Sequence, residues 1–299
     1  MTIVSIQNGK TLKKISKERI SYLFLLPAFS IYILFFIYPL FRAFIYSFCE
    51  YKGRGFVYVG VKNYLYFLQD DVFRRIILNT CTMCVILVPT VIISSVLIAN
   101  YIVRKKQIVR GTLMGIFYFP GVTSIVTICI VWKWIYNSEG ILNYFLSLLD
   151  IQGINWLGNP SSALLSVVVV LIYICIGMPI ILITASIGNI PDCFYEVASL
   201  EGATNLQKLI YITLPLIKPT ILYLAIILTI TSFRAFIFVI LLTAGGPYYS
   251  SSVIASYLAN TAFECGQFGK ASTIGILLLI IISILTLIQY KFFKGSVEY

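Results

Sequence analysis

The chain has 299 residues, of which 60% are hydrophobic and only 11% are charged, and its mean hydropathy is +0.96. Soluble globular proteins carry about 25% charged residues, so this composition excludes a soluble enzyme or binding module and leaves no stretch polar enough for a separate soluble domain. The net charge of +11 would suggest nucleic-acid binding in a soluble protein, but the basic residues lie beside apolar segments. We therefore expect a membrane protein with no nucleic-acid partner.

Six apolar segments are long enough to cross about 30 Å of hydrocarbon as helices. The first is too long for a signal-peptide core and lacks a small-residue cleavage site, which indicates a retained anchor. The six predicted spans are residues 21–48, 79–103, 112–136, 163–187, 219–242 and 271–293. The predicted fold is an all-α, polytopic membrane protein: a cytoplasmic tail (1–20), one transmembrane domain (21–293) and a C-terminal tail (294–299).

Basic residues predict the orientation of these spans in the cell membrane. The N-terminal tail and the loop at 104–111 are rich in Lys and Arg, whereas the loop at 137–162 has neither. By the positive-inside rule the tail and the second loop are cytoplasmic, and six spans return the C-terminus to the same side. The first outer loop runs against this pattern, because it also holds basic residues, together with acidic ones: Lys52, Arg54, Lys62, Arg74, Arg75, Glu50, Asp70 and Asp71.

Residues that carry catalytic or metal chemistry are sparse. The chain has no His, and its seven Cys include one Cys-x-x-Cys pair, Cys81 and Cys84, with no second Cys or His pair to complete a metal site. No Gly-x-x-x-x-Gly-Lys-Ser/Thr is present, so the chain cannot cradle ATP phosphates by that route. We therefore expect no enzyme activity, no metal and no cofactor on this chain.

The fourth loop, residues 188–218, is too long for a simple turn, and long loops in compact proteins are usually functional. Pro191 can open a helix and Gly202 can end it in a left-handed conformation. A second short helix follows, and Pro215 and Pro219 break it before the fifth span. The loop therefore predicts a helix–turn–helix at the cytoplasmic face, either docking a partner or packing only on its own bundle.

The spacing within this loop resembles the EAA loop of ABC importer permeases, which reads Glu-Ala-Ala, three residues, Gly, nine residues and Ile-x-Leu-Pro. Val197 departs from the first Ala of that pattern, and the remaining spacing is intact. In that family the loop is a coupling helix that docks into a cleft of the ATPase subunit. The resemblance implies five coupling residues here: Glu196, Ala198, Gly202, Leu214 and Pro215.

Further stretches resemble the maltose- and glycerol-phosphate-type permeases, and specifically the first of the two homologous permeases in such systems. They are Leu25–Ala28, Tyr38–Leu40, Val59–Tyr64, Gly140–Asn143, Leu242–Pro247 and Phe268–Ser272. The resemblance implies that this chain forms half of the translocation pathway of a sugar importer. The implied partners are a second permease, two ATP-binding cassette subunits that bind ATP and Mg, and an extracellular solute-binding protein.

The same resemblance implies a set of substrate-path residues on the fourth and fifth spans. They are Leu171, Ile174, Cys175, Met178, Leu228, Ser232 and Ala235. Arg234 joins this set on its own chemistry, because a charge inside a span marks a functional site unless it snorkels to the interface. Both interpretations of Arg234 remain open at this point.

Other functions are compatible with a helical membrane protein. The same machinery could import glycerol phosphate, a peptide or an amino acid. A secondary transporter is less favoured, because the spans hold no Asp or Glu for ion coupling and the halves do not repeat. A structural or assembly protein of the membrane is the third alternative.

Overall fold

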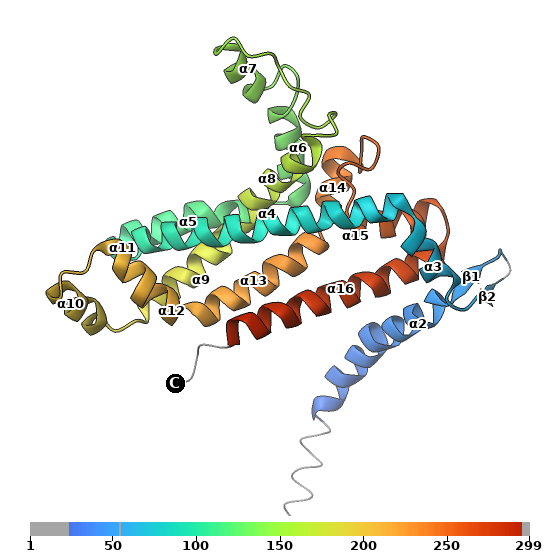
Figure 1. The fold of residues 1–299 in the computed structure, drawn as a ribbon, viewed down its shortest axis with the longest axis horizontal. Coiled ribbons are helices and arrows are strands. Elements are labelled where there is room, and N and C mark those ends of the chain that lie inside the picture. The colour runs from blue at the N-terminus through green and yellow to red at the C-terminus, as the bar shows by residue number, and fades with distance from the viewer. Residues whose placement is uncertain (1–23, 54, 295–299) are drawn as a thin grey trace, which may run out of the picture.

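The computed structural model describes residues 24–53 and 55–294, and these form the predicted helical membrane fold (Figure 1). Three helices are long and apolar enough to cross a membrane unbroken: Phe24–Ser47, α4 (Asp71–Ile102) and Phe268–Phe293 of α16 (Phe268–Lys294). They correspond to the first, second and sixth predicted spans. The predicted N-terminal tail, and residues 295–299 of the predicted C-terminal tail, lie outside the described residues.

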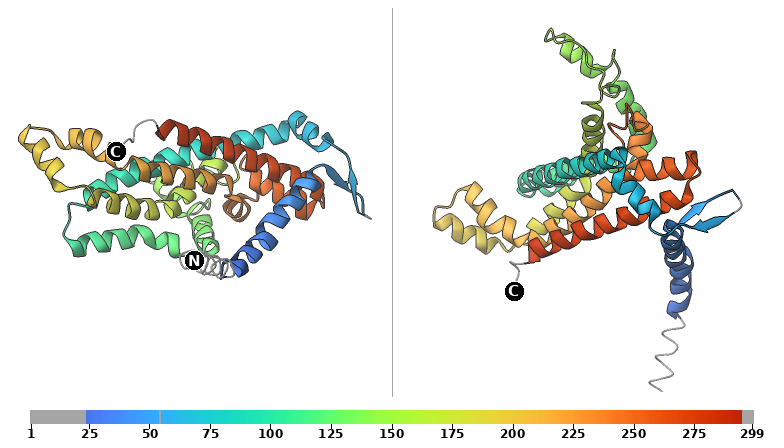
Figure 2. Two further views of the ribbon diagram at one scale, coloured as in Figure 1. Left: turned by 90° about the horizontal axis from the view of Figure 1, so that it is seen from below. Right: turned by 45° about the vertical axis from the view of Figure 1, so that its right-hand side comes forward.

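The first long helix contains a π-helical turn, η1 (Ile33–Ile37), followed by α2 (Tyr38–Ser47). None of its most apolar window is buried within this chain. Figure 2 shows it leaving the bundle at an angle, and its packing partner is α16, at the outer end. The apolar surface of this helix is therefore available to lipid or to another subunit.

The first outer loop contains the only two strands among the described residues. Strands β1 (Cys49–Tyr51) and β2 (Phe56–Tyr58) pair antiparallel, and helix α3 (Lys62–Gln69) follows. The buried amide of Asn63 donates to the carbonyl oxygens of Ser47 and Cys49, at 3.0 and 2.9 Å. Asn63 thereby fixes α3 against the end of the first span.

Helix α4 begins eight residues before the second predicted span. The Asp70 carboxylate accepts a hydrogen bond from the Val72 amide at 2.9 Å, which caps the helix. Phe73 and Ile76 are buried in this added segment. The hydropathy pattern located the membrane crossing but could not show that the helix continues beyond it.

The third predicted span is two helices, α5 (Gln107–Val122) and α6 (Ile125–Ile135), that meet at 94°. Pro120 lacks an amide hydrogen and interrupts the helical hydrogen bonds near the end of α5. The next two residues, Thr123 and Ser124, leave the helical conformation, with ψ of 149° and 128°. The chain therefore turns sharply, and α6 and α7 (Ile141–Ser147) project from the bundle (Figures 1 and 2).

The projecting outer loop is organised around one buried amide side chain, that of Asn143. Its amide nitrogen donates to the carbonyl oxygens of Asn137, Ser138 and Ile154. Its oxygen accepts from the Ile154 amide and from the Trp156 indole, both at 3.0 Å. Buried polar groups need partners, so this network fixes the loop's two ends together.

The fourth predicted span is also bent, by 44°, between α8 (Ala163–Cys175) and α9 (Gly177–Gly188). Helix α9 packs directly on α5 at Gly177. A Cβ at that position would lie 2.7 Å from the Cα of Tyr118 and 2.9 Å from the carbonyl carbon of Phe117. Only glycine allows the two backbones this close.

The fifth predicted span consists of α13 (Lys218–Phe233) and α14 (Phe236–Thr243), separated at Arg234 and Ala235. Helix α15 (Ile254–Ala259) and the π-helical η3 (Asn260–Glu264) then form the last outer loop. The fifth span is therefore broken inside its predicted length, which places a charged residue at the break.

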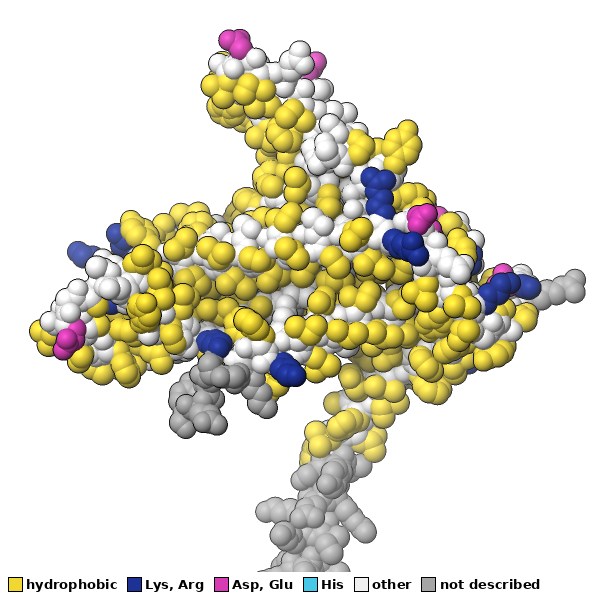
Figure 3. Space-filling model, viewed as in Figure 1, with side chains coloured by type: hydrophobic (Ala, Val, Ile, Leu, Met, Phe, Trp, Pro, Cys, Tyr) yellow, Lys and Arg dark blue, Asp and Glu magenta, His cyan; other side chains and the backbone are white. Residues whose placement is uncertain are grey.

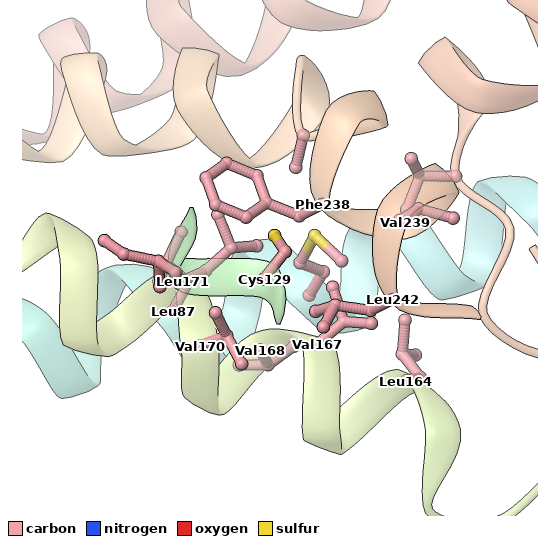
Figure 4. Close-up of a cluster of buried hydrophobic side chains, with 14 of the residues drawn as sticks. Leu87, Cys129, Leu164, Val167, Val168, Val170, Leu171, Phe238, Val239 and Leu242 are labelled. Atoms are coloured by element: carbon pink, nitrogen blue, oxygen red, sulfur yellow. The ribbon is translucent and has the colours of Figure 1, made fainter. Parts of the chain in front are cut away.

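The core has three clusters of buried apolar side chains, and the largest joins α4, α6, α8 and α14. Figure 4 shows Leu87, Cys129, Leu171, Phe238 and Val239 converging there. A second cluster joins α9 and α13 to the loop between them. Figure 3 shows that hydrophobic side chains cover most of the visible face, as expected for a surface in contact with lipid.

Candidate coupling surface and translocation path

The loop between the fourth and fifth spans has the predicted helix–turn–helix. Helix α10 (Asp192–Leu200) ends where Gly202 adopts a left-handed φ of +75°, and the Ala203 amide then donates to the Ala198 carbonyl at 2.9 Å. Helix α11 (Asn205–Lys208) starts with a capping box between Thr204 and Gln207. The chain continues through η2 (Leu209–Thr213) and α12 (Leu214–Leu216) into α13 after a bend of 72°.

Three side-chain hydrogen bonds hold this hairpin in place. The hydroxyls of Tyr195 and Thr213 lie 3.0 Å apart and join α10 to η2. Lys208 donates to the Ser199 hydroxyl at 2.7 Å, across the turn. Arg104, at the end of α4, donates to the side chain of Asn205 at 3.1 Å. These bonds connect α10 to η2, which leads into α13, and connect α11 to the end of α4.

Helix α10 presents an exposed surface at one extreme end of the molecule (Figure 1). Phe194, Val197 and Leu200 are 49, 60 and 88% exposed, and none of the nine residues of α10 is buried. The carboxylate of Glu196 is exposed and forms no ion pair with any described residue. An apolar surface with an available charge is suited to a protein partner.

The other predicted coupling residues lie behind this surface. Ala198 is half-buried and its carbonyl supports the turn at Gly202. Leu214 is half-buried against the second core cluster, whereas Pro215 is exposed at the start of α12. The hairpin thus has Glu196 and Ala198 on α10 and Gly202 in the turn that follows it, with Leu214 and Pro215 where the hairpin joins the bundle.

Three cavities follow α13, α14 and the last outer loop from the inner half of the bundle to its outer face. The inner cavity is about 360 Å³, the middle one about 550 Å³ and the outer one about 570 Å³. Thr231 lines both the inner and middle cavities. Phe236, Ala259 and Phe263 line both the middle and outer ones. The shared residues make the three cavities neighbours along one route.

Six of the eight predicted path residues line this route. Ile174, Cys175, Met178 and Leu228 line the inner cavity, and Arg234 and Ala235 line the middle one. Leu171 and Ser232 line none of the three and are fully buried: Leu171 lies in the largest core cluster, and the Ser232 hydroxyl donates to the Thr229 carbonyl at 2.8 Å. The path role of all eight stays a prediction.

Several aromatic side chains line the route, and the sequence alone did not single them out. Tyr118 and Tyr223 line the inner cavity, and Tyr248, Tyr249 and Tyr257 line the outer one. With 21 Tyr and 21 Phe in the chain, composition offers no signal that separates these rings from lipid-facing ones. Thr231 could have been found, because it lies three residues after Leu228 on one face of the helix.

The loop that lines the outer cavity is held in a strained conformation. Ala244, Tyr248 and Tyr249 have positive φ values of 51°, 49° and 59°, which are unusual for residues other than glycine. Asn79, on α4, donates to the carbonyl oxygens of Tyr249 and Ser252, at 2.9 and 3.1 Å. Such strain persists where surrounding contacts impose it, and it concentrates at functional sites.

Tyr257 links the outer cavity to the start of α4. Its hydroxyl lies 3.5 Å from a carboxylate oxygen of Asp70, to which it donates. Burial is the largest cause that raises the pKa of Tyr257, and the negative charge of Asp70 raises it further. The Tyr257 hydroxyl therefore stays protonated as a donor at physiological pH.

Comparison with known proteins identifies the family. The family described as "Binding-protein-dependent transport system inner membrane component" matches residues 71–298. A probable ABC transporter permease of Bacillus subtilis, YurN, is 34% identical, with 93% of this chain and 97% of the relative covered. The trehalose/maltose permease MalF of Thermococcus litoralis is 30% identical, with 96% and 98% covered.

A solved structure has the same fold. It is a crystal structure of a bacterial alginate ABC transporter in complex with an alginate-pentasaccharide-bound periplasmic protein. One of its chains superposes with a TM-score of 0.82 at 25% identity, with 95% of this chain and 99% of that chain covered. From the fold and these matches, the chain belongs to the family of binding-protein-dependent transport system inner membrane components.

Proposed function

We propose that this chain is a permease subunit of an ATP-driven importer that takes a carbohydrate from an extracellular solute-binding protein. The main support for the proposal is the arrangement around α13. The hairpin, with its exposed apolar surface, lies at one end of this helix, and the three cavities follow the same helix away from the hairpin. The names of the relatives support the cargo, since they include a trehalose/maltose permease and the multiple sugar-binding permease MsmF of Streptococcus mutans.

In this proposal the chain forms half of the pathway and a second homologous permease forms the other half. Two ATP-binding cassette subunits bind ATP and Mg and hydrolyse the nucleotide. When they close, they move α10, and the hydrogen bonds of Tyr195 and Arg104 transmit this displacement to α13 and α4. A displaced α13 would open or close the route that it lines.

The test is assembly with the ATPase. Co-expressed with an ATP-binding cassette subunit from the same organism, the full chain should co-purify with its cognate subunit in a fixed ratio. The charge-reversing Glu196→Lys variant should weaken this association, because an exposed carboxylate on the docking surface would be replaced by a positive charge. A chain that stays monodisperse without the ATPase would favour a structural membrane protein instead.

The proposed orientation has both termini, and α10, in the cytoplasm. Two native cysteines are exposed and test it directly: Cys193 on α10, and Cys265 after η3. In intact cells a membrane-impermeant maleimide should label a variant that keeps only Cys265. A variant that keeps only Cys193 should be labelled only after the membrane is permeabilised. The opposite labelling pattern would reverse the orientation.

A further inference from the structure

The inner and middle cavities of the route share one feature that the proposed function does not require, a single charged side chain. Among the described residues that line the inner and middle cavities, Arg234 is the only one with a charge. Its neighbours in the middle cavity are mainly apolar, including Ile230, Phe236 and Ile237. The guanidinium group is a cation, so this cavity carries a positive charge.

The guanidinium of Arg234 has no counter-ion within the described chain. It forms no hydrogen bond or ion pair with any described residue, and its side chain is exposed. The nearest acidic residue along the route is Glu264, which lines the outer cavity and there accepts a hydrogen bond from Asn260. The charge is therefore available to a ligand in the middle cavity.

The position of Arg234 argues against an interface anchor. It follows the 16 residues of α13 and precedes the eight of α14, so it lies about 24 Å from one end of the span and about 12 Å from the other. Even the shorter of these two distances exceeds the length of an arginine side chain, so the guanidinium cannot reach the membrane interface. The break in the helix at this point also matches the general placement of transport sites at discontinuous helices near the middle of the membrane.

The chemistry of the cavity indicates its ligand. A guanidinium presents planar, paired N–H donors that match the oxygens of a carboxylate, phosphate or sulfate. An apolar surrounding strengthens that attraction, whereas a neutral ligand would leave the charge without a counter-ion. The aromatic rings of Phe236 and Phe263 border the same cavity and offer apolar faces to a sugar ring.

We propose that Arg234 is a specificity-determining residue and that the imported carbohydrate carries an acidic group. This inference rests on the proposed function, since it names the substrate class of the same route. It goes beyond that function because neutral sugars would satisfy the importer equally well.

The test is uptake into proteoliposomes that contain the complete transporter, with saturating solute-binding protein outside and ATP inside. The probes are two matched pairs: digalacturonate with its uncharged dimethyl ester, and trehalose 6-phosphate with trehalose. The binding protein's own affinity for each probe is measured separately, and it is identical for every permease variant. Differences between variants therefore report on the permease alone.

We expect the wild type to import the acidic probe of at least one pair. Arg234→Gln should reduce the uptake of that acidic probe about tenfold or more, which is the effect of losing one charged hydrogen bond. Arg234→Lys should fall between the two, since it retains the charge and loses the paired donors. The control is Arg42→Gln: Arg42 lies on α2, over the ring of Tyr46 at 4.9 Å, and its loss should leave uptake unchanged.

Two results would overturn the inference and leave the proposed function standing. One is uptake confined to the neutral probes, and the other is uptake of an acidic probe that Arg234→Gln leaves at the wild-type rate. Failure of the complete transporter to import any of the four carbohydrates would count against the proposed carbohydrate cargo itself, and the inference would fall with it.

Discussion

The Gly202→Val variant is expected to lose substrate-stimulated ATPase activity in the assembled transporter while it still inserts and folds. Gly202 ends α10 at a φ of +75°, where a Cβ costs about 1–2 kcal/mol and a β-branched side chain is an outlier. That free energy changes the population of the correctly turned hairpin by a factor of roughly 5–30. A Cβ at this glycine would meet no atom within 4 Å, so the effect comes from the backbone and not from a clash.

A matched control separates backbone strain from the loss of glycine itself. Asn tolerates the left-handed region, so Gly202→Asn should retain most of the ATPase stimulation. The measurement is ATP hydrolysis by the reconstituted complex, with membrane abundance followed in parallel. Normal stimulation in Gly202→Val would show that the turn does not set the coupling geometry.

The Gly177→Val variant should destabilise the bundle itself. Its Cβ would lie 2.7 Å and 2.9 Å from backbone atoms of Tyr118 and Phe117, and backbone cannot rotate out of the way as a side chain can. Helices α5 and α9 must therefore separate, which we expect to cost about 3 kcal/mol, the upper end of the range for overpacking. The thermal midpoint of the detergent-solubilised chain should fall by roughly 5 °C or more.

Gly115→Val is the matched control for this variant, because Gly115 lies on α5 and a Cβ there would meet no atom within 4 Å. Its thermal midpoint should stay close to that of the wild type. Equal midpoints for the two variants would mean that α5 and α9 do not pack as closely as the structure has them. Gly177 also lies between Cys175 and Met178, which both line the inner cavity, so its substitution should alter the route as well.

Local pattern was sufficient to predict most of the helical framework and the helix–turn–helix of the fourth loop. Length and hydropathy located the spans. The helix end at Gly202 and the start of the next helix could be predicted because capping depends on residues only a few positions apart. The same local logic could have indicated the break after Pro120. It could not have given the 94° between α5 and α6, since that angle depends on which neighbours the two helices contact.

The route of cavities could be predicted only in part. The interruption at Arg234 and Ala235 has no glycine or proline to mark it, so the sequence reads as one continuous span. Leu171 and Ser232 belong to helices that line the cavities or border them, but both side chains face the core. Which side of a helix is buried depends on the rotation of that helix about its own axis. In spans that are apolar on all sides, the sequence carries little signal for that rotation.

The measurement that tests the proposed function most directly is carbohydrate uptake by the complete reconstituted transporter, with and without ATP inside the vesicles. The account predicts accumulation that requires both internal ATP and the external solute-binding protein, and that Gly202→Val abolishes. Accumulation driven by a proton or sodium gradient in the absence of ATP would contradict it, and would make this chain a secondary transporter.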